Sequence, residues 1–368
     1  MKIICITKEL KEAVSVAERN TSKNQILQVL GSLLLETNGQ NKLKIKATNL
    51  ELAIEITIPA KVETQGSLVL PAKNLNMLIS NISEESLIIQ NQNNNVFIKT
   101  KNTQTVLKGL NSEDFPLFPK TGDLTFVDFN TSDLREVFAN VVVSSSLSDI
   151  KPELASIYMR FFKNSVKFAA TDSFRLAEKV LVSKENYSDK MFSILIPQKS
   201  VIEIIRIIPE DGKLKFGFNK NFLVLDTLSI KLISRLVDGV FPDYDQIIPK
   251  NFKTNVLVKN EDFIRSIKVA SALSGRLSDI TLQFNPQKKS ISFFTSNSDV
   301  GEHNSEVESE VSGEEVKAKY NWRYLLDGVS QIKSEYLNLG LNGDSLPMVI
   351  KGKGDNSFLY LVMPMRGV

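Results

Sequence analysis

Hydrophobic and polar residues follow the same order three times along the chain. The stretches KIKATNLELAIEI, VKFAATDSFRLAEKV and ISFFTSNSDVGEHNSEV each contain an alternating strand, a Thr/Ser-Asn/Asp step and a second strand. The steps begin at Thr48, Thr171 and Ser296, at separations of 123 and 125 residues. This spacing predicts three copies of one folding unit.

A second pattern follows each copy, in which a short apolar strand runs into a helix start. It is present in LVLPAKNLNMLISNI, SILIPQKSVIEIIRII and KAKYNWRYLLDGVSQI. Pro71 and Pro197 suit a first helical turn, where a missing N–H costs nothing, and Asn321 suits an N-cap. These positions are 126 and 124 residues apart, so an independent signal supports the repeat.

Each copy also begins with a helical pattern, in TKELKEAVSVAERN, TSDLREVFANVVVSSS and KNEDFIRSIKVASALSG. The predicted fold class is therefore α+β, with three repeats of two helices and several strands. Turn-rich segments place the domains at 1–121, 122–250 and 251–368. A period this long excludes a solenoid and favours an arc, which a head-to-tail dimer would close into a ring of six repeats.

Composition limits the class of protein. The 368 residues are 42% hydrophobic and 24% charged, which is typical of a folded soluble protein. No apolar run approaches the roughly 18 residues of a membrane span, and MKIICITKEL does not resemble a secretory signal. A single cysteine, Cys5, excludes an internal disulfide. We therefore expect a cytoplasmic protein.

Residues that carry catalysis are scarce. With one histidine and one cysteine, the chain cannot form a multi-ligand His/Cys zinc site, and His303 lies in the acidic stretch GEHNSEVESE, which reads as a solvated loop or edge. No glycine-rich phosphate loop occurs. Neither a metal, a cofactor nor a catalytic residue is predicted. An alternative is a metal-dependent phosphodiesterase or nuclease built on carboxylates, with Asp172, Asp243 and Asp245 as candidates.

Charge is nearly balanced overall but uneven locally. A net charge of +3 is small for a protein that neutralises many phosphates by bulk charge. FIKTKNTQTVLKGL has lysines and no acid, whereas SDVGEHNSEVESE has five acids. These segments could be a head-to-tail dimer contact or simply two solvated strand faces. The candidate dimer-interface residues are Lys99, Lys101, Leu107, Lys108, Glu302 and Glu306.

The last ten residues, LYLVMPMRGV, combine two patterns. Leu359 to Leu361 read as a final strand, and Val362 to Arg366 are expected to leave the sheet. Methionine side chains adapt to varied partners, so this second part is predicted to form a docking surface.

Three motifs resemble the bacterial DNA sliding clamp family, the beta subunits of DNA polymerase III. They are ATDSFRLAEK (170–179), LVDGVFPDYDQIIPK (236–250) and LVMPMR (361–366), and the resemblance covers the whole chain. It implies a non-catalytic processivity factor, a homodimeric ring of six domains that encircles double-stranded DNA and slides without sequence preference. Implied partners are the polymerase III catalytic subunit, an ATP-driven clamp loader, and replication and repair proteins with clamp-binding peptides.

The resemblance also implies a peptide-binding pocket between the second and third domains. Its members would be Leu154, Thr171, Ser173, Phe174, Arg175, Leu176, Pro242, Ile247, Tyr324, Leu346, Val362, Met363, Pro364, Met365 and Arg366. The chain departs from the family in having Ser173-Phe174 where Gly-His is usual and Gln246 where a base is common. Its ending, MPMRGV, is also one residue longer than usual.

DNA contacts implied by the resemblance come from two loops and from the starts of the second helices. The candidates are Lys23, Asn24, Lys73, Lys151, Gln198, Lys199 and Arg206. An equally weighted reading of the helix charges is that they occupy the solvated side of amphipathic helices.

Overall fold

The chain folds into two compact units. A computed structural model describes residues 1–22, 27–37, 39, 41–182, 187 and 191–365. The first unit comprises Met1–Thr131 and Pro209–Leu236, and the second comprises Ser132–Ile208 and Val237–Val368. The candidate residues Lys23, Asn24 and Arg366 lie outside the described residues.

Six α-helices occupy the predicted segments in the described part of the chain. They are α1 (Thr7–Arg19), α2 (Ala72–Ser80), α3 (Thr131–Val142), α4 (Gln198–Ile207), α5 (Asn260–Ser271) and α6 (Trp322–Val329), with short 3-10 turns η1 (Gln28–Gly31), η2 (Ser112–Asp114) and η3 (Asp245–Ile247). Asn321 caps α6 as predicted, because its side-chain oxygen accepts from the Arg323 backbone N–H at 2.9 Å. Pro71 and Pro197 lie one residue earlier than predicted, at the N-caps.

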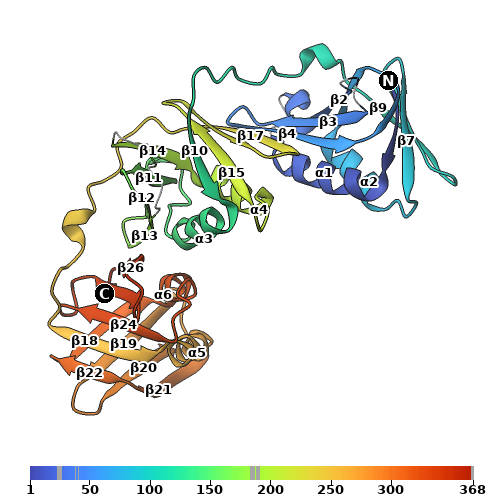
Figure 1. Cartoon of the computed structure of the whole chain (residues 1–368). Helices are drawn as coiled ribbons and strands as arrows, with labels where there is room; N and C mark the ends of the chain where they lie inside the picture. The colour runs from blue at the N-terminus through green and yellow to red at the C-terminus, as the bar shows by residue number, and fades with distance from the viewer. Residues whose placement is uncertain (23–26, 38, 40, 183–186, 188–190, 366–368) are drawn as a thin grey trace. The chain divides into compact units, whose positions relative to one another are not determined.

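The first unit contains two antiparallel sheets, with α1 packed beside α2 (Figure 1). The five-stranded sheet has the order β5-β1-β7-β8-β9, and the eight-stranded sheet has the order β10-β15-β16-β17-β4-β3-β2-β6. Their strands are β1 (Lys2–Ile6), β2 (Ser32–Thr37), β3 (Lys42–Thr48), β4 (Leu52–Pro59), β5 (Lys61–Thr64), β6 (Ser67–Pro71), β7 (Ser86–Gln92), β8 (Asn95–Lys99), β9 (Gln104–Lys108), β10 (Thr125–Asn130), β15 (Lys213–Phe218), β16 (Phe222–Asp226) and β17 (Ile230–Arg235).

The second unit also has two antiparallel sheets, and α5 lies beside α6 (Figure 1). A nine-stranded sheet has the order β14-β11-β12-β13-β26-β25-β24-β18-β22, and a four-stranded sheet has the order β21-β20-β19-β23. Their strands are β11 (Ser156–Phe161), β12 (Ser165–Thr171), β13 (Arg175–Val182), β14 (Phe192–Pro197), β18 (Thr254–Lys259), β19 (Asp279–Asn285), β20 (Ser290–Asn297), β21 (Gly301–Glu308), β22 (Glu310–Gly313), β23 (Val316–Asn321), β24 (Tyr336–Leu341), β25 (Met348–Gly352) and β26 (Phe358–Val362).

The sheets cross the boundaries between repeats. Strand β4 of the first repeat pairs with β17 of the second, and β13 of the second repeat pairs with β26 of the third. The central repeat therefore contributes strands to both compact units, which explains why the units do not follow the three-fold division of the sequence. The predicted α+β class, with two helices and antiparallel strands in each repeat, is confirmed.

The end of the chain corrects one prediction. Val362 does not leave the sheet, because it is the last residue of β26, is fully buried, and pairs with both Arg175 and Met348. Residues 363–365 follow the strand with half-buried side chains. Within the described residues, no helix has the length and apolarity needed to cross a lipid bilayer.

Candidate peptide-docking site

The turn between β12 and β13 positions the first part of the site. Asp172 Oδ1 accepts from the backbone N–H groups of Phe174 and Arg175 at 2.9 and 3.0 Å. Thr171 Oγ1 donates to the Arg175 carbonyl at 2.7 Å and accepts from the Ser173 N–H at 3.1 Å. These bonds hold Ser173 at a φ of 76°, a backbone conformation that residues with a Cβ atom seldom adopt. The Thr-Asp step in the sequence is thus a rigid turn.

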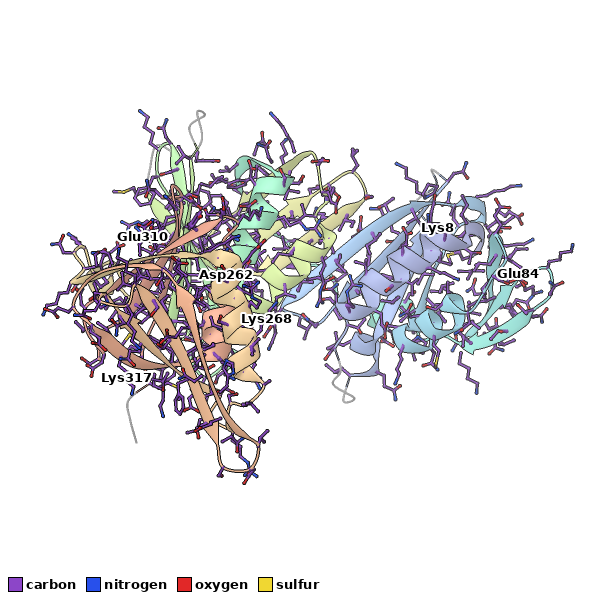
Figure 2. All side chains as sticks on the ribbon, turned by 90° about the horizontal axis from the view of Figure 1, so that it is seen from below. Lys8, Glu84, Asp262, Lys268, Glu310 and Lys317 are labelled. Atoms are coloured by element: carbon purple, nitrogen blue, oxygen red, sulfur yellow. The ribbon has the colours of Figure 1, made fainter. Side chains whose placement is uncertain are left out.

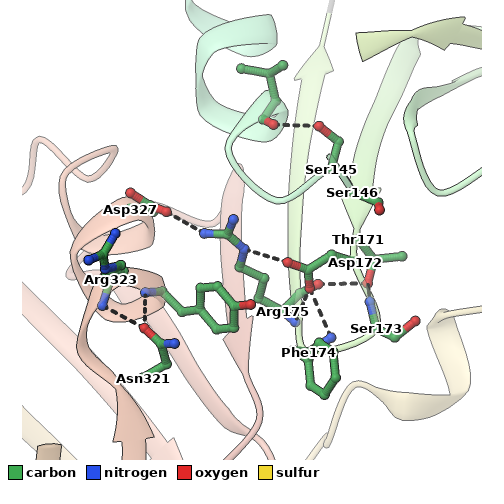
Figure 3. Close-up of polar contacts among 12 residues, drawn as sticks. Ser145, Ser146, Thr171, Asp172, Ser173, Phe174, Arg175, Asn321, Arg323 and Asp327 are labelled. Carbon is green, nitrogen blue, oxygen red and sulfur yellow. Dashed lines mark hydrogen bonds and ion pairs between the residues drawn. The ribbon is translucent and has the colours of Figure 1, made fainter. Parts of the chain in front are cut away.

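Arg175 connects this turn to helix α6 (Figure 3). Its Nε contacts Asp172 Oδ2 at 2.9 Å, its Nη1 donates to Asp327, and its Cζ lies 4.3 Å from the centroid of the Tyr324 ring. The residue is only 9% exposed. Burial disfavours the charge, but Tyr360, Asp327 and Asp172 outweigh it and raise the pKa of Arg175. The guanidinium therefore stays cationic while most of its surface faces this chain.

Strand β26 and the residues after it form the next part of the site. The Met363 N–H donates to the Phe174 carbonyl at 2.8 Å, and the Met365 N–H donates to the Lys319 carbonyl at 2.7 Å. Met363 packs against a buried apolar cluster, together with Tyr158, Val237, Ile248 and Phe252. The buried members of this cluster are Ala169, Leu176, Leu195, Phe241, Tyr244, Val349, Leu359 and Leu361. The tail is therefore seated on the core by both backbone bonds and side-chain packing.

The segment after residue 240 is held on the same sheet by a polar contact. Tyr244 donates to Glu178 Oε2 at 2.6 Å, and Lys167 Nζ lies 3.0 Å from the same oxygen and 3.3 Å from Asp245. Burial, and then the Glu178 charge, raise the pKa of Tyr244 well above its ordinary value, so the hydroxyl stays protonated as a donor. These contacts hold the segment that contains Pro242 and Ile247 against β12 and β13.

The structure places the candidate pocket residues at several depths. Leu176 and Val362 are buried in the sheet, and Leu154 and Thr171 are nearly so. The exposed apolar residues are Phe174, Ile247 and Leu346, at 61%, 52% and 49%. Pro242 and Ser173 are exposed, and Tyr324, Met363, Pro364 and Met365 are half-buried. Hydrogen bonds, strand pairing or ring contact join Thr171, Ser173, Phe174, Arg175, Leu176, Tyr324, Val362 and Met363 directly. A role in binding a peptide stays a prediction for every candidate.

The described candidate DNA residues lie at helix starts, on one loop and, in the case of Arg206, in the last turn of α4. Lys73 is exposed in the first turn of α2, and Gln198 and Lys199 begin α4. Lys199 Nζ lies 2.8 Å from Asp149, which places the Lys151 loop beside the start of α4. Arg206 is 3.5 Å from Glu203, one turn earlier. Some of these cations are thus partly neutralised within the chain.

Charges of both signs also share helix α5. Figure 2 shows Asp262 and Lys268 on this helix, where the Asp262 carboxylate pairs with Arg265 one turn later. This i,i+3 arrangement is what a solvated face of an amphipathic helix contains. On α5, the contacts therefore support the alternative in which the helix charges simply occupy the solvated side of an amphipathic helix.

The candidate dimer-interface residues lie at sheet edges. Lys108 and Leu107 are on β9, Lys99 ends the neighbouring β8, and Lys101 lies between these strands. Glu302 and Glu306 are on β21, the first strand of the four-stranded sheet. Among the described strands, β9 pairs only with β8 and β21 only with β20. Each edge therefore presents unpaired backbone groups that another strand could use.

Groups considered for catalysis are engaged elsewhere or buried. The Asp172 carboxylate serves the turn and Arg175, and Asp243 accepts from the Gln246 amide at 2.7 Å. His303 lies on edge strand β21, beside Ser305 at 3.0 Å. Burial, and then Glu9, raise the pKa of Cys5 to about 12, which suppresses its thiolate. No cluster of three potential metal ligands occurs among the described residues.

Sequence reasoning predicted Tyr324 as a site residue but missed two other residues that build the site, Asp327 and Tyr360. Asp327 and Tyr324 contact Arg175 from α6, and Tyr360 donates to the Tyr324 carbonyl at 2.7 Å. Gly328 lies so close to Tyr360 that a Cβ there would be 2.2 Å from its ring. Arg175 and Asp327 are 152 residues apart, so no local pattern could reveal the pair. Only the glycine inside an amphipathic helix was a signal of close packing.

Comparison with known proteins gives one consistent result. Three family models match in order: the DNA polymerase III beta subunit N-terminal domain at residues 1–119, its central domain at 128–243, and its C-terminal domain at 245–366. The beta sliding clamp of Synechococcus elongatus is 26% identical over 375 residues, covering 100% of this chain and 99% of that protein. That of Staphylococcus aureus is 24% identical, covering 94% of both.

Solved structures agree on the fold. The DNA polymerase sliding clamp of Bacillus subtilis has a TM-score of 0.93 at 22% identity, and the DNA polymerase III beta subunit of Pseudomonas aeruginosa has a TM-score of 0.92 at 21% identity. Both comparisons cover 100% of each chain. The similarity thus extends over every repeat and is not confined to one domain.

Proposed function

The chain belongs to the family of DNA polymerase III beta subunits, the bacterial sliding clamps, and from this premise we propose that it works as a non-catalytic ring. Two copies would join head to tail, encircle duplex DNA, slide without reading sequence and tether the polymerase III catalytic subunit. The match of all three consecutive family domains carries this proposal. The proposal includes the predicted division of each copy into three clamp domains, residues 1–121, 122–250 and 251–368.

The sheet edges support the proposed dimer. Strand β9 carries Leu107 and Lys108, with Lys99 and Lys101 close by in sequence, and β21 carries Glu302 and Glu306. If β9 of one copy paired with β21 of its partner, two open edges would disappear and opposite charges would meet. Two β9 edges meeting each other would place lysines together, so the charges favour the head-to-tail arrangement.

Tethering gives the ring its function without chemistry. A polymerase that releases the primer end but stays attached to an encircling ring remains at a high effective concentration near that end. A modest net charge suits sliding, because many fixed phosphate contacts would strengthen binding at the expense of movement. Lys73, Lys151, Gln198, Lys199 and Arg206 remain the proposed DNA contacts, and the docking residues would bind clamp-binding peptides of the polymerase, the ATP-driven loader and other partners.

Sedimentation and DNA retention test this proposal. We expect a species of twice the 41.2 kDa chain mass. After loading by an ATP-driven clamp loader, the protein should stay on nicked circular DNA and leave when the circle is cut. A stable monomer at micromolar concentration, or equal retention on linear DNA, would contradict the ring.

The nuclease alternative has its own test. Its candidate Asp172 is engaged with Arg175 and with two backbone N–H groups of the turn, which argues against a free metal ligand. Mg²⁺-dependent release of mononucleotides that is abolished by Asp172→Asn would support the alternative and overturn the non-catalytic assignment.

A further inference from the structure

The docking site of this chain holds its arginine in an internal network. Both identified hydrogen-bond donors of Arg175 are directed at Asp172 and Asp327, and its guanidinium lies against the Tyr324 ring. With 9% of its surface exposed, Arg175 fixes the turn to α6 and offers little to a ligand. An acidic group on a bound peptide would therefore find a poor partner at this position.

Phe174 presents the largest exposed apolar surface in the same turn. Its backbone N–H is held by Asp172 at 2.9 Å and its carbonyl by the Met363 N–H at 2.8 Å, whereas its side chain is 61% exposed. The backbone is thus fixed before any ligand binds, so contact with the ring would cost little conformational entropy. Met363, whose N–H bonds to the Phe174 carbonyl, is half-buried, and Ile247, 52% exposed, is a further apolar residue of the predicted pocket.

The segment that carries the predicted pocket residues Pro242 and Ile247 is negatively charged. The segment from Pro242 to Ile247 contains two exposed aspartates, Asp243 and Asp245, and no lysine or arginine. Lys167 lies 3.3 Å from Asp245, but it is shared with Glu178 at 3.0 Å. Gln246 contributes a neutral amide that donates to Asp243. Glu178 and Asp245 thus share one ammonium group, and Asp243 is paired only with a neutral amide in the described contacts, which favours a cation on the ligand.

We propose that this site selects peptides with an aromatic or branched apolar residue that packs on Phe174 and a lysine or arginine beside Asp243 and Asp245. The occupant is a short segment of a replication partner, and the inference rests on the proposed peptide-docking function. Phe174 and the two aspartates set the preference, while Arg175 acts as a positioning residue.

Fluorescence anisotropy with the full chain tests this preference. Two fluorescein-labelled nonapeptides share the same two leucines and one phenylalanine separated by serines, and end in Lys-Lys or in Asp-Asp. We expect the lysine probe to bind about 10-fold more tightly at low salt, and the ratio to shrink as NaCl screens the charges. The double variant Asp243→Asn/Asp245→Asn should remove most of the ratio, while the matched surface variant Asp226→Asn should keep it.

The aromatic contact is tested with a second matched pair. Phe174→Ser should weaken both probes about 5- to 10-fold, because an exposed ring in a rigid turn is a typical anchor. Phe126→Ser removes a ring of similar exposure, 55%, on β10 in the other compact unit, and should change affinity less than about 2-fold.

The outcomes separate this inference from the proposed function. Deletion of residues 363–368 should abolish binding of both probes if the docking site is correct. Equal affinity for both probes, with binding still lost on deletion, would overturn the charge preference and leave the site intact. Binding that survives the deletion, or no binding of either probe, would overturn the docking site and the inference with it.

Discussion

Two junctions in this chain join a strand of one repeat to a strand of the next. In the first, β4 pairs with β17 from Leu52 opposite Ser234 to Ile56 opposite Ile230. In the second, β13 pairs with β26 from Arg175 opposite Val362 to Lys179 opposite Phe358. Just beyond each pairing, a backbone N–H donates to the turn at 2.8 Å, from Arg235 at the end of β17 in one case and from Met363 after β26 in the other.

The turns that begin these junctions have the same backbone geometry. Thr48 and Asn49 make the bonds that Thr171 and Asp172 make, and Leu50 and Ser173 share a φ of 76°. The segments that follow each pair of strands make similar contacts: Lys46 of β3 lies 5.8 Å from the ring centroid of Phe118, and Lys167 of β12 lies 5.8 Å from that of Tyr244, although the repeat aligns Lys167 with Lys44. The repeated Thr-Asn/Asp step therefore determines the backbone conformation of both turns.

Side chains make the two junctions different. The first ends in Arg235, whose Nε donates to the Leu50 carbonyl and whose guanidinium lies over Phe222. The second ends in half-buried methionines, and its Arg175 is paired on the side of α6. The arginine at the end of the first junction thus contacts groups of that same junction, whereas the methionines after the second junction leave apolar surface exposed. This difference explains why a docking site is proposed at only one of them.

Placing an arginine in the first junction, at the position that corresponds to Arg175, should cause the largest loss of stability. Leu52 is 5% exposed and corresponds to Arg175, but its turn contains Asn49 in place of an aspartate. Leu52→Arg buries an unpaired charge and should lower the free energy of unfolding of the first unit by about 3 kcal/mol. Hydrogen exchange of β4 and β17 measures the loss.

Two further variants make this test specific. Leu50→Arg, at a position 52% exposed in the same turn, should cost less than about 0.5 kcal/mol. Adding Asn49→Asp to Leu52→Arg should restore about 1 kcal/mol by supplying a carboxylate. Equal losses for both arginine variants would show that burial is not the cause.

Removing the arginine from the second junction should have the next largest effect. Arg175→Leu frees Asp172 and Asp327 from their pairing, but Asp327 is 46% exposed and can be hydrated. We therefore expect a loss of about 2 kcal/mol, below the 3–5 kcal/mol typical of fully buried pairs. Urea unfolding followed by Trp322 fluorescence measures it, because the single tryptophan lies in the second unit. The exposed Arg323→Leu is the control and should leave the midpoint almost unchanged.

The close approach of α6 to β26 should tolerate little added volume. In a helix interior, Gly→Ala normally stabilises by about 1 kcal/mol. At Gly328 the new Cβ would lie 2.2 Å from the Tyr360 ring, and overpacking should outweigh this gain and leave a net loss of 1–2 kcal/mol, roughly. Gly275→Ala, where no atom lies within 4 Å, should show no such loss. A raised urea midpoint for Gly328→Ala would contradict the packing.

The cross-strand ion pairs offer a finer comparison. Lys44 of β3 and Glu55 of β4 are 2.7 Å apart next to the first junction, and Lys167 of β12 and Glu178 of β13 are 3.0 Å apart next to the second. Lys44→Ala should cost about 0.5 kcal/mol, and Lys167→Ala about 1 kcal/mol because it also loses Asp245 and the Tyr244 ring. Denaturant midpoints of the two variants, at low and high salt, provide the measurement. A larger loss of stability for Lys44→Ala than for Lys167→Ala would contradict the stabilising contribution assigned to Asp245 and the Tyr244 ring.

The smallest expected effect is a pH dependence confined to the second junction. Burial opposes ionisation of Asp355, but bonds from Ser357 and the charge of Lys179 of β13 outweigh it and lower its pKa. A lowered folded-state pKa contributes stability above the unfolded pKa, and this is lost as pH falls through the folded value. Asp355→Asn should therefore lower the unfolding midpoint slightly at pH 7 and converge with the parent chain in strong acid. A constant difference at all pH values would exclude this cause.

The sequence by itself determined the repeated elements, because hydrophobic period and turn chemistry are local properties. The six helices, the Thr-Asn/Asp turns and the Asn321 cap could all be read from neighbours along the chain. The motifs around Arg175 and Met363 predicted, through the family resemblance, that these residues belong to one docking site, and this stays a prediction. The family membership predicted from them is confirmed.

Only the tertiary structure decided how these residues are used. The pairing of β13 with β26 keeps Val362 in the sheet, and the approach of Gly328 to Tyr360 brings Asp327 to Arg175. The pairing of β13 with β26 and the contact of Arg175 with Asp327 join residues more than 150 positions apart, and the energies of all these contacts depend on burial and on partners that no local pattern specifies. The sequence therefore identified an arginine at the site, and folding determined that its charge is satisfied within the chain.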